Sequence, residues 1–464
     1  MTLALTKSGW GWQKVIYEGY LLAIQRPAAS IRPHLGQNIR NSSQKQRLKS
    51  TALLGVAARH YSSRTSPQPA AKLQMADQKP ILISGAGLSG LLLAHSLRSH
   101  DIPFLIFERD ESIAARAQGY RLRISTDGIN ALKEVLTDSE YKRLQTGTSQ
   151  TGGGGIHNLD ALTGEPVPSK SSEGGSGKGS GLGGDVLGVS RGFLRKCLFE
   201  GEEDVVRWDK RSTGYSVSGS GVKLKFSDGT ESPEGSLLIA ADGPQSAITK
   251  QLTNGKVRAY DTGARMIHGQ TTTKAYKQLG EGVFFAFDHS VSDGGTLGLI
   301  TNVRPGSLED EDVELGWVFV GSPGAFALPE DQLYGIGKVA ADLSRKLTSQ
   351  WHEKFKPIFE QQNDEEAAFL KMWTAHPNGV PEWKNEPRVT IAGDAVHTMT
   401  PAGGVGANTA LRDAAFLGRL LGEAGGWHEG LTSEYEKEMR VYASENVKMS
   451  FEAASKRFNI TDLK

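Results

Sequence analysis

KPILISGAGLSGLLLAHSLRSHDIPFLIFER, residues Lys79 to Arg109, is the stretch that decides the fold. An apolar run leads into a glycine-rich turn and a leucine run, and a second apolar run after Pro103 ends at Glu108. The order of strand, glycine turn, helix, strand and acid makes a G-x-G-x-x-G pattern specific for dinucleotide binding. An ordinary glycine turn in a βαβ unit is the weaker interpretation, because the acid is also in place.

Each glycine of this turn has a predicted task. Gly85 permits the tight turn, Gly87 lets the backbone approach a pyrophosphate, and Gly90 allows close packing of helix on strand. The helix N-terminus offers unpaired N–H groups and a partial positive charge to the phosphates. Glu108 can accept hydrogen bonds from both hydroxyls of a ribose and disfavours a 2′-phosphate. The expected ligand is therefore the ADP half of FAD or NAD.

The composition narrows the class of protein. The chain has 464 residues, which suits about two or three domain-sized units. Its formal net charge of +1 argues against nucleic acid as the main partner. The single cysteine, Cys197, rules out an intrachain disulfide or a cysteine metal cluster, and its apolar helical surroundings indicate packing. No apolar run approaches the roughly 18 residues of a membrane span, so no transmembrane segment is expected.

Residues 1–78 differ from the rest of the chain. Up to Ala76 they contain eleven Lys or Arg and a single acid, Glu18. A composition rich in Arg and Ser and poor in acids is typical of a mitochondrial transit peptide, and the sequence around Tyr61 resembles a matrix-protease cleavage site. We therefore predict a mitochondrial protein. The alternative is a misassigned start, with translation beginning at Met75 and a cytoplasmic protein.

The middle of the chain alternates between ordered and glycine-rich patterns. Residues 151–188 are rich in Gly and Ser and predict a flexible loop, because such a segment buries little apolar surface. A helix is expected from Arg191, and a buried strand at 237–240 ends in Asp242. Short strands with Gly, Asp and Pro breaks from about 257 to 320 indicate a mixed sheet.

A third apolar strand, near residue 390, also ends in an acid, Asp394, and the glycine-rich turn PAGGVGAN follows at 401–408. Three strands that each end in an acid should share one sheet whose carboxyl ends build a single cofactor site. Asp394 can hold the hydroxyls of a flavin's ribityl chain, while Gly403, Gly404 and Gly406 leave room for a planar ring. The helix that follows directs its N-terminus at that ring, where reduced flavin carries negative charge.

Together the glycine turn with Glu108, the Asp242 motif and the Asp394 motif resemble the aromatic-hydroxylase family of FAD-dependent monooxygenases, such as para-hydroxybenzoate and salicylate hydroxylases. The resemblance implies an α/β fold: a Rossmann-like FAD-binding domain of the glutathione-reductase type with an inserted mixed-sheet substrate domain and C-terminal helices. The implied boundaries are a leader at 1–78, an FAD-binding domain at 79–250 and 388–425, a substrate domain at 251–387 and C-terminal helices at 426–464.

The resemblance also implies roles for individual residues. Arg109 would contact the adenosine and pyrophosphate side, Arg191 the flavin, and the Asp242 motif both FAD and NADPH. The family usually has a basic residue soon after Ser246, where this chain offers only Lys250, and this leaves the reductant contact open. No catalytic residue and no metal ligand is predicted. The predicted cofactor-binding residues are Gly85, Gly87, Leu88, Ser89, Gly90, Glu108, Arg109, Arg191, Asp242, Gly243, Asp394, Gly404, Gly406, Ala407 and Asn408.

The reaction that the resemblance implies uses FAD, NADPH or NADH as co-substrate, and O2. A flavin C4a-hydroperoxide would insert one oxygen atom, by hydroxylation or epoxidation, into an aromatic or conjugated small molecule. A flavin-dependent reductase or halogenase of the same fold, or a non-catalytic flavoprotein, remains the alternative. His397 is expected to form a structural hydrogen bond, Trp317 and Phe319 to lie in the core, and Arg121 or Arg123 is a candidate to face the substrate cavity.

Overall fold

The computed structural model describes residues 78–114, 121–150, 155–168, 186–291, 294–327, 329 and 335–464. The predicted leader, its cleavage site and residues 169–185 of the Gly/Ser-rich stretch lie outside the described residues. The described residues all belong to one compact unit, Gln68–Lys464.

The motif strand β1 (Ile81–Ser84) lies in a parallel sheet, and all its residues are buried. Continuous apolar runs suit a strand that is covered on both faces. Among the described residues this sheet has the order β16-β10-β1-β2-β7, and every neighbouring pair is parallel. The other strands are β2 (Phe104–Phe107), β7 (Val206–Arg207), β10 (Leu237–Ala240) and β16 (Val389–Ile391).

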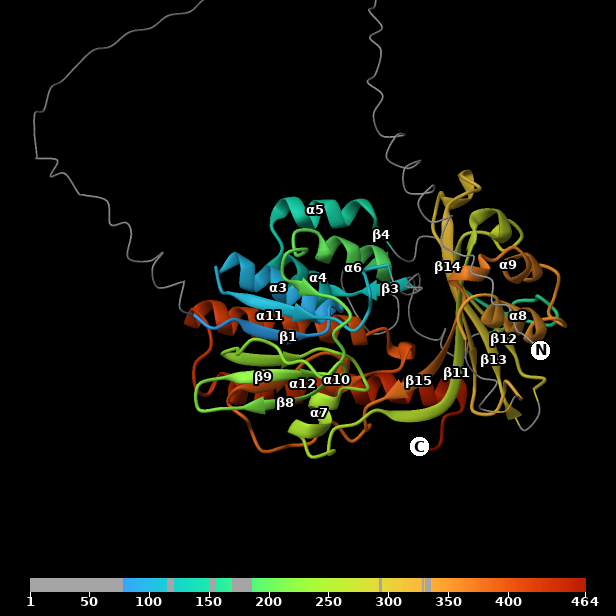
Figure 1. Ribbon diagram of the computed structural model, residues 1–464. Helices are drawn as coiled ribbons and strands as arrows, with labels where there is room; N and C mark the ends of the chain where they lie inside the picture. The colour runs from blue at the N-terminus through green and yellow to red at the C-terminus, as the bar shows by residue number, and fades with distance from the viewer. Residues whose placement is uncertain are drawn as a thin grey trace, which may run out of the picture. The chain divides into compact units, whose positions relative to one another are not determined.

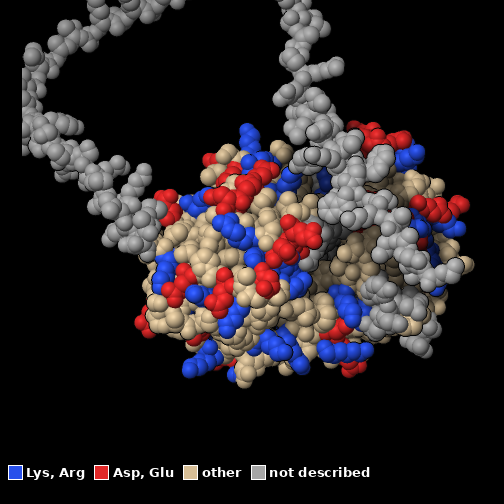
Figure 2. Space-filling model, in the orientation of Figure 1, with Lys and Arg blue, Asp and Glu red and all other residues tan. Residues whose placement is uncertain are grey.

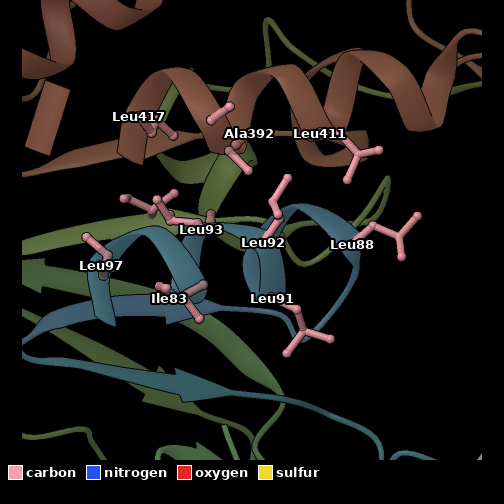
Figure 3. Packing of buried hydrophobic residues seen from close by; sticks show 14 of the residues in the cluster. Ile83, Leu88, Leu91, Leu92, Leu93, Leu97, Ala392, Leu411 and Leu417 are labelled. Carbon is pink, nitrogen blue, oxygen red and sulfur yellow. The ribbon is translucent and has the colours of Figure 1, made fainter. Parts of the chain in front are cut away.

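Helices α3 (Leu88–Ser99) and α11 (Gly406–Ala424) pack together beside this sheet. Figure 3 shows the leucines of α3 between strand β1 and the leucines of α11. The two helices approach closely at Gly418, where an added Cβ would lie 2.2 Å from Ser96 Oγ. This apolar layer fixes both helix N-termini near the carboxyl end of the sheet.

A second, mixed sheet has the order β15-β11-β14-β13-β12-β5 among the described residues (Figure 1). Neighbouring strands are antiparallel except β12 and β5, which are parallel. Helices α8 (Lys338–Leu347) and α9 (Lys356–Glu360) pack against one face of this sheet. The core between them contains Trp317 and Phe319, as predicted. The strands are β5 (Ile156–Asp160), β11 (Tyr260–Thr272), β12 (Gly282–Asp288), β13 (Leu297–Val303), β14 (Glu314–Gly321) and β15 (Ala368–Thr374).

Strand β5 corrects the prediction of a flexible loop over 151–188. It pairs with β12, so this part of the glycine-rich stretch belongs to the mixed sheet. Leu159 is buried, and the ring of His157 stacks on Phe284 with centroids 4.7 Å apart. The chain then turns back, and Val167 N donates to Asn158 O at 2.8 Å. A short alternating segment is thus ordered by a neighbouring strand despite its glycine-rich flanks.

The remaining elements complete the unit. The predicted C-terminal helix or helix pair is a single helix, α12 (Leu431–Phe458). None of the described helices combines the length and the apolar character that crossing a membrane requires. On the face shown in Figure 2, Lys and Arg side chains are interspersed with Asp and Glu. The other elements are β3 (Arg121–Ile124), β4 (Ser149–Gln150), β6 (Leu187–Ser190), β8 (Ser212–Val217), β9 (Val222–Phe226), α4 (Thr126–Val135), α5 (Asp138–Thr146), α6 (Arg191–Phe199), α7 (Ala247–Leu252) and α10 (Asp394–His397).

Candidate functional site

The carboxyl ends of four parallel strands lie in a row, in the order β2, β1, β10 and β16. They are followed by Glu108, the Gly85 turn, Asp242 and Asp394, respectively. Because neighbouring strands are about 4.8 Å apart, the ends of β2 and β16 are separated by about 14 Å. The prediction that the acid-tipped strands share one sheet is confirmed, and their row suits an elongated ligand.

The three glycines of the first turn differ in what surrounds them. Gly85 has a φ of +105°, and an added Cβ would lie 2.4 Å from Ala241 O. At Gly90 an added Cβ would lie 2.1 Å from Gly85 O, so helix and turn touch there. At Gly87 the nearest atom would be 4.0 Å away, and this residue is half-buried. Close packing therefore requires glycine at positions 85 and 90, whereas Gly87 leaves the space that a pyrophosphate needs.

Both helices that were predicted to face the cofactor lack a side-chain cap. Gly87 is the N-cap of α3, and no side chain accepts from its first turn, where Leu88 and Ser89 lie. Val405 is the N-cap of α11, and this helix likewise has no side-chain cap. By contrast, Ser190 caps α6 by accepting from Phe193 N. Uncapped first turns offer their N–H groups to an anion.

Glu108 is buried against the glycine turn and a buried arginine. Its Oε2 accepts from Ala86 N at 2.7 Å, and its Oε1 accepts from Asp110 N at 3.0 Å. Arg195 donates from Nε to Ala86 O at 2.8 Å. Its Nη2 lies 3.7 Å from the carboxylate of Glu108 and 3.7 Å from that of Asp110. Arg195 was not among the residues predicted from the sequence. A signal was present, because a cation one helical turn after Arg191 on an apolar helix face needs acidic partners.

Asp242 has an oxygen available for a ligand. Its Oδ1 is buried without a hydrogen-bond partner among the described residues. Burial raises the pKa of Asp242 to about 6, and a hydrogen bond from Ser246 and the charge of Arg109 offset part of that rise. The following Gly243 has a φ of +90° and open space beside it. A buried oxygen without a partner beside an open turn suits a ligand hydroxyl.

Asp394 begins α10, after Gly393 with a φ of +61°. Its side chain is exposed, yet burial raises its pKa, with His397 and Arg191 offsetting part of the rise. The carboxylate is therefore accessible to solvent, although protein groups surround it closely enough to disfavour its charge. The charge of Arg191, at the start of α6, reaches this carboxylate, so two predicted cofactor residues lie near each other.

The glycine-rich turn before α11 presents backbone rather than side chains. Gly404, with a φ of +65°, Gly406 and Ala407 are half-buried, as expected for residues that line a ring. Gly403 has a structural role in addition to the predicted one. An added Cβ there would lie 3.0 Å from Ser450 Cα, so the packing of α12 requires this glycine.

Asn408 acts through its neighbours. Its Oδ1 accepts from Ser125 N at 2.9 Å, and its Nδ2 donates to Arg123 O at 3.0 Å and to Gly404 O at 2.9 Å. The side chain is buried and fastens the glycine turn to strand β3. The predicted contact of Asn408 with the ring stays a prediction, and its side chain positions the turn that would line the ring.

His397 is buried and hydrogen-bonded, as predicted. Its Nε2 lies 2.7 Å from Asp413 Oδ2, which also accepts from Gly393 N at 2.7 Å. Burial lowers the pKa of His397, but the charge and hydrogen bond of Asp413 outweigh this and raise it above its ordinary value. The pair holds the backbone turn that carries Asp394. Lys250, the candidate reductant contact, is exposed on α7.

The mixed sheet presents an apolar wall, which we define as Phe285, Ile300 and Val318. These residues are register partners across β12, β13 and β14, and all are half-buried. They lie on the face opposite the α8 and α9 layer, because the alternate residues fill that core. Ile300 and Val318 pack against the same small cluster as Ala402 of the glycine-rich turn. The wall therefore adjoins the turn that would line a flavin ring.

These observations fit FAD. Glu108 and the uncapped α3 suit the ADP half. The unpartnered Asp242 oxygen, the exposed Asp394 and the half-buried turn before α11 suit the ribityl chain and the ring.

Comparisons with known proteins agree with this geometry. Residues 340–450 match the family described as FAD binding domain, and residues 83–135 match an NAD(P)-binding Rossmann-like domain. The chain is 32% identical over 411 residues to the dual O-methyltransferase/FAD-dependent monooxygenase CTB3 of Cercospora beticola, which covers 82% of this chain and 46% of that protein. The FAD-dependent monooxygenase phnB of Penicillium herquei is 25% identical over 409 residues, with 81% of this chain and 90% of that protein covered.

The chain spans less than half the length of the first curated relatives that it matches. Among solved structures, a Photorhabdus luminescens protein assigned as an FAD-containing monooxygenase matches with a TM-score of 0.65 and 26% identity, over 82% of this chain and 99% of that one. A salicylate hydroxylase substrate complex shares the fold, with a TM-score of 0.59 and 19% identity over 83% and 90% of the two chains. By its motifs, its fold and these relatives, the chain is similar to the FAD-dependent, aromatic-hydroxylase-like flavoprotein monooxygenases.

Proposed function

We propose that this chain is an NAD(P)H-dependent monooxygenase that inserts one oxygen atom from O2 into an aromatic or conjugated small molecule. The observation that carries the proposal is the row of strand ends. Glu108, the open Gly87, Asp242 and Asp394 lie along one edge of a parallel sheet, beside an apolar wall.

Each part of the row has a task toward FAD. Glu108 accepts from ribose hydroxyls, and the first turn of α3 binds the pyrophosphate. Asp242 and Asp394 would accept from ribityl hydroxyls, because Asp242 has an oxygen without a partner among the described residues and Asp394 is exposed. The N-terminus of α11 stabilises negative charge on the reduced ring.

When bound, FAD supplies the redox chemistry, taking electrons from NAD(P)H and passing an oxygen atom from O2 to the substrate. The chain's contribution is to position the substrate and to exclude water. Phe285, Ile300 and Val318 provide an apolar surface for both tasks beside the glycine-rich turn.

The relatives suggest the class of substrate. CTB3 is named as a dual O-methyltransferase/FAD-dependent monooxygenase. O-methyl transfer needs a hydroxyl group, and an electron-rich hydroxylated ring is also what an oxygen-inserting flavoprotein attacks. We therefore favour a hydroxylated aromatic ring as the substrate.

Two other functions are compatible with the same fold. A flavin-dependent halogenase would require halide, and a reductase would oxidise NAD(P)H without transferring oxygen. A non-catalytic flavoprotein would bind FAD and leave NAD(P)H unoxidised with every ring compound. The intact acids of the row favour an enzyme over this last alternative.

The test begins with the purified full-length chain loaded with FAD. We expect a bound flavin spectrum, and NAD(P)H consumption that rises when phenols and aryl acids are added, with a product 16 mass units heavier. Asp394→Asn is expected to weaken FAD binding about tenfold or more, because a charge-assisted hydrogen bond is lost. Fluorescence titration of FAD measures this change.

Asp204→Asn is the matched control, since the Asp204 side chain is 73% exposed and pairs with Arg98 at the surface. It should leave FAD affinity unchanged. A protein that takes up no FAD, or an Asp394 variant with unaltered affinity, would contradict the proposed function.

We also propose mitochondrial import, which the basic, acid-poor composition of residues 1–78 supports. Fluorescent tags on the full chain and on a form starting at Met75 should show organelle import of the first alone. Cytosolic signal from both forms would overturn this proposal.

A further inference from the structure

The chain that leads from α7 into β11 (Figure 1) forms one side of a pocket of about 290 Å³. Lys256, Arg258 and His376 line this pocket, and no Asp or Glu lines it in the part of the chain that the structure describes. Lys256 Nζ donates to Glu382 O at 3.2 Å, and an ammonium group has three donors to offer. Two cations and a histidine without an opposing carboxylate favour an anion as the ligand.

The side chains of two lining residues are held in place by a shared aromatic neighbour. The guanidinium of Arg258 lies over the ring of Tyr260, 4.5 Å from its centroid. The ring of His376 is nearly perpendicular to the same tyrosine ring, with centroids 5.3 Å apart. His376 Nδ1 accepts from Asn378 N at 3.2 Å, so its Nε2 carries a hydrogen and is a donor. Less conformational entropy is lost on binding when such groups are already oriented.

The loop that carries His376 is fastened on both sides of that residue. Ala375 N donates to Thr398 O at 2.7 Å, directly after α10. Val380 N donates to Ser444 Oγ of α12 at 2.9 Å. The loop is therefore a preformed wall of the pocket, and its backbone does not have to become ordered when a ligand binds.

The pocket adjoins segments that are predicted to bind FAD. Its lining includes Val396 on α10, two residues after Asp394. Helix α7, which follows the Asp242 motif, is joined to α10 because Thr249 Oγ1 donates to Ala395 O at 3.0 Å. A ligand in the pocket would lie beside the helix that begins with Asp394, on the segment for which the sequence left the reductant contact open.

We propose that this pocket binds the 2′-phosphate of NADPH through Lys256, Arg258 and His376, and that the chain therefore prefers NADPH to NADH. The proposal rests on the proposed function, which takes NAD(P)H as the reductant. A phosphate monoester carries about −1.5 to −2 charges near pH 7 and three strong acceptor oxygens, which match two cations and an N–H donor. Glu108 disfavours a 2′-phosphate at the first turn of α3, so this phosphate needs a separate cationic site.

The size of the pocket agrees with this assignment. About 290 Å³ is at the lower end of the volumes of small-molecule sites, so the pocket suits one end of a dinucleotide rather than the whole. Lys250 is the rival contact, but it is exposed on α7 and is not among the described residues that line the pocket. A single exposed ammonium binds an anion weakly, because water and salt screen its charge.

The first arm of the test compares adenosine 2′,5′-bisphosphate with adenosine 5′-monophosphate, which lacks only the 2′-phosphate. Isothermal titration calorimetry on the full-length, FAD-loaded chain should show the bisphosphate binding about tenfold or more tightly, as charge-assisted hydrogen bonds predict. Arg258→Gln and Lys256→Gln should each remove most of this difference by weakening the bisphosphate alone, and Arg258→Lys should retain part of it. Equal binding of the two nucleotides by the unaltered chain would overturn the proposal without any variant.

The second arm measures the KM values of NADPH and NADH. Arg258→Gln should raise the KM of NADPH about tenfold and change that of NADH by less than about twofold, because only NADPH carries the phosphate. Lys338→Gln is the matched control, since the Lys338 side chain is 72% exposed and pairs with Asp342 on α8. It should change neither value. If Lys250→Gln abolished the preference for NADPH and Arg258→Gln did not, the assignment to the pocket would be refuted.

Two further outcomes separate this site from other functions. 2-Naphthoate, an aryl acid, should not displace the bisphosphate, and displacement that Arg258→Gln abolishes would make the pocket a site for the substrate and refute the proposal. Failure to bind FAD, or to oxidise either nicotinamide, would contradict the proposed function itself. Normal oxidation of both nicotinamides without a preference for NADPH would contradict only the phosphate site.

Discussion

Tyr442 Oη donates a hydrogen bond of 2.6 Å to Asp413 Oδ1, and this bond joins α12 to α11 inside the protein. Both residues are buried, and the other oxygen of the same carboxylate binds Gly393 N and His397 Nε2. One carboxylate therefore connects the C-terminal helix, the helix that begins at the predicted flavin ring, and the turn that carries Asp394.

Replacing Tyr442 with Phe removes a donor from this buried carboxylate. Hydrogen bonds to charged groups contribute about 1.5–3 kcal/mol, so Tyr442→Phe should lower the free energy of unfolding by about that amount. Urea unfolding followed by circular dichroism measures it. Tyr215→Phe is the control, because the Tyr215 hydroxyl forms no hydrogen bond among the described residues, and equal effects of the two variants would contradict the prediction.

The pKa of Asp242, raised by burial from 3.8 to about 6, predicts a pH dependence of stability in the protein without FAD. Between these values the folded state holds a proton that the unfolded state has lost. The stabilisation is therefore complete below about pH 4 and disappears as the pH rises through 6.

Asp242→Asn lacks this titration. Relative to the unaltered chain, the variant should gain about 2–3 kcal/mol in free energy of unfolding between pH 4 and pH 7. Urea midpoints of both proteins across this range provide the measurement. A difference that stays constant with pH would show that Asp242 titrates normally.

Two glycines of the first turn should respond differently to a methyl group. Gly87 has a φ of −81°, which alanine adopts, and space beside it, so Gly87→Ala should fold normally but bind FAD about tenfold more weakly. Gly90→Ala should instead lose about 1–3 kcal/mol of stability, because the new Cβ meets Gly85 O. Thermal unfolding and FAD titration of both variants separate the two effects, and similar profiles would contradict the assigned roles.

Arg195 lies between Glu108 and Asp110, and all three residues are buried. Arg195→Gln leaves two acids without their cation, so it should cost about 3–5 kcal/mol of stability. Arg143→Gln, which breaks an exposed pair with Glu200, should cost less than about 1 kcal/mol. Denaturant unfolding compares them. A small loss for Arg195→Gln would mean that water already solvates this cluster.

Sequence reasoning succeeded where local chemistry determines the structure. Apolar runs that end in Glu108, Asp242 and Asp394 predicted one parallel sheet, because strands buried on both faces leave a continuous apolar pattern. The separate tasks of Gly85 and Gly90 also followed from the motif, since only glycine tolerates those contacts. The domain boundaries at 250 and 388 stay predictions.

The contacts that the sequence did not reveal have a common physical cause, since they join residues far apart in the chain. Arg195 meets Glu108 across 87 positions, and its burial could be inferred only if its partners were known. Gly403 meets Ser450, and Asn408 meets Ser125, through helix packing that has no local signature. The Gly/Ser composition around β5 concealed a strand that its neighbour β12 orders.

Strand β5 has a consequence for engineering. Residues 156–160 complete the mixed sheet, although the chain on both sides of them builds the small sheet of β3, β4 and β6. A chimera that exchanges only residues 251–387 between relatives would combine the donor's mixed sheet with an edge strand, β5, from the recipient. Transplanting substrate preference within this family therefore calls for two grafts, the second of which carries residues 155–168.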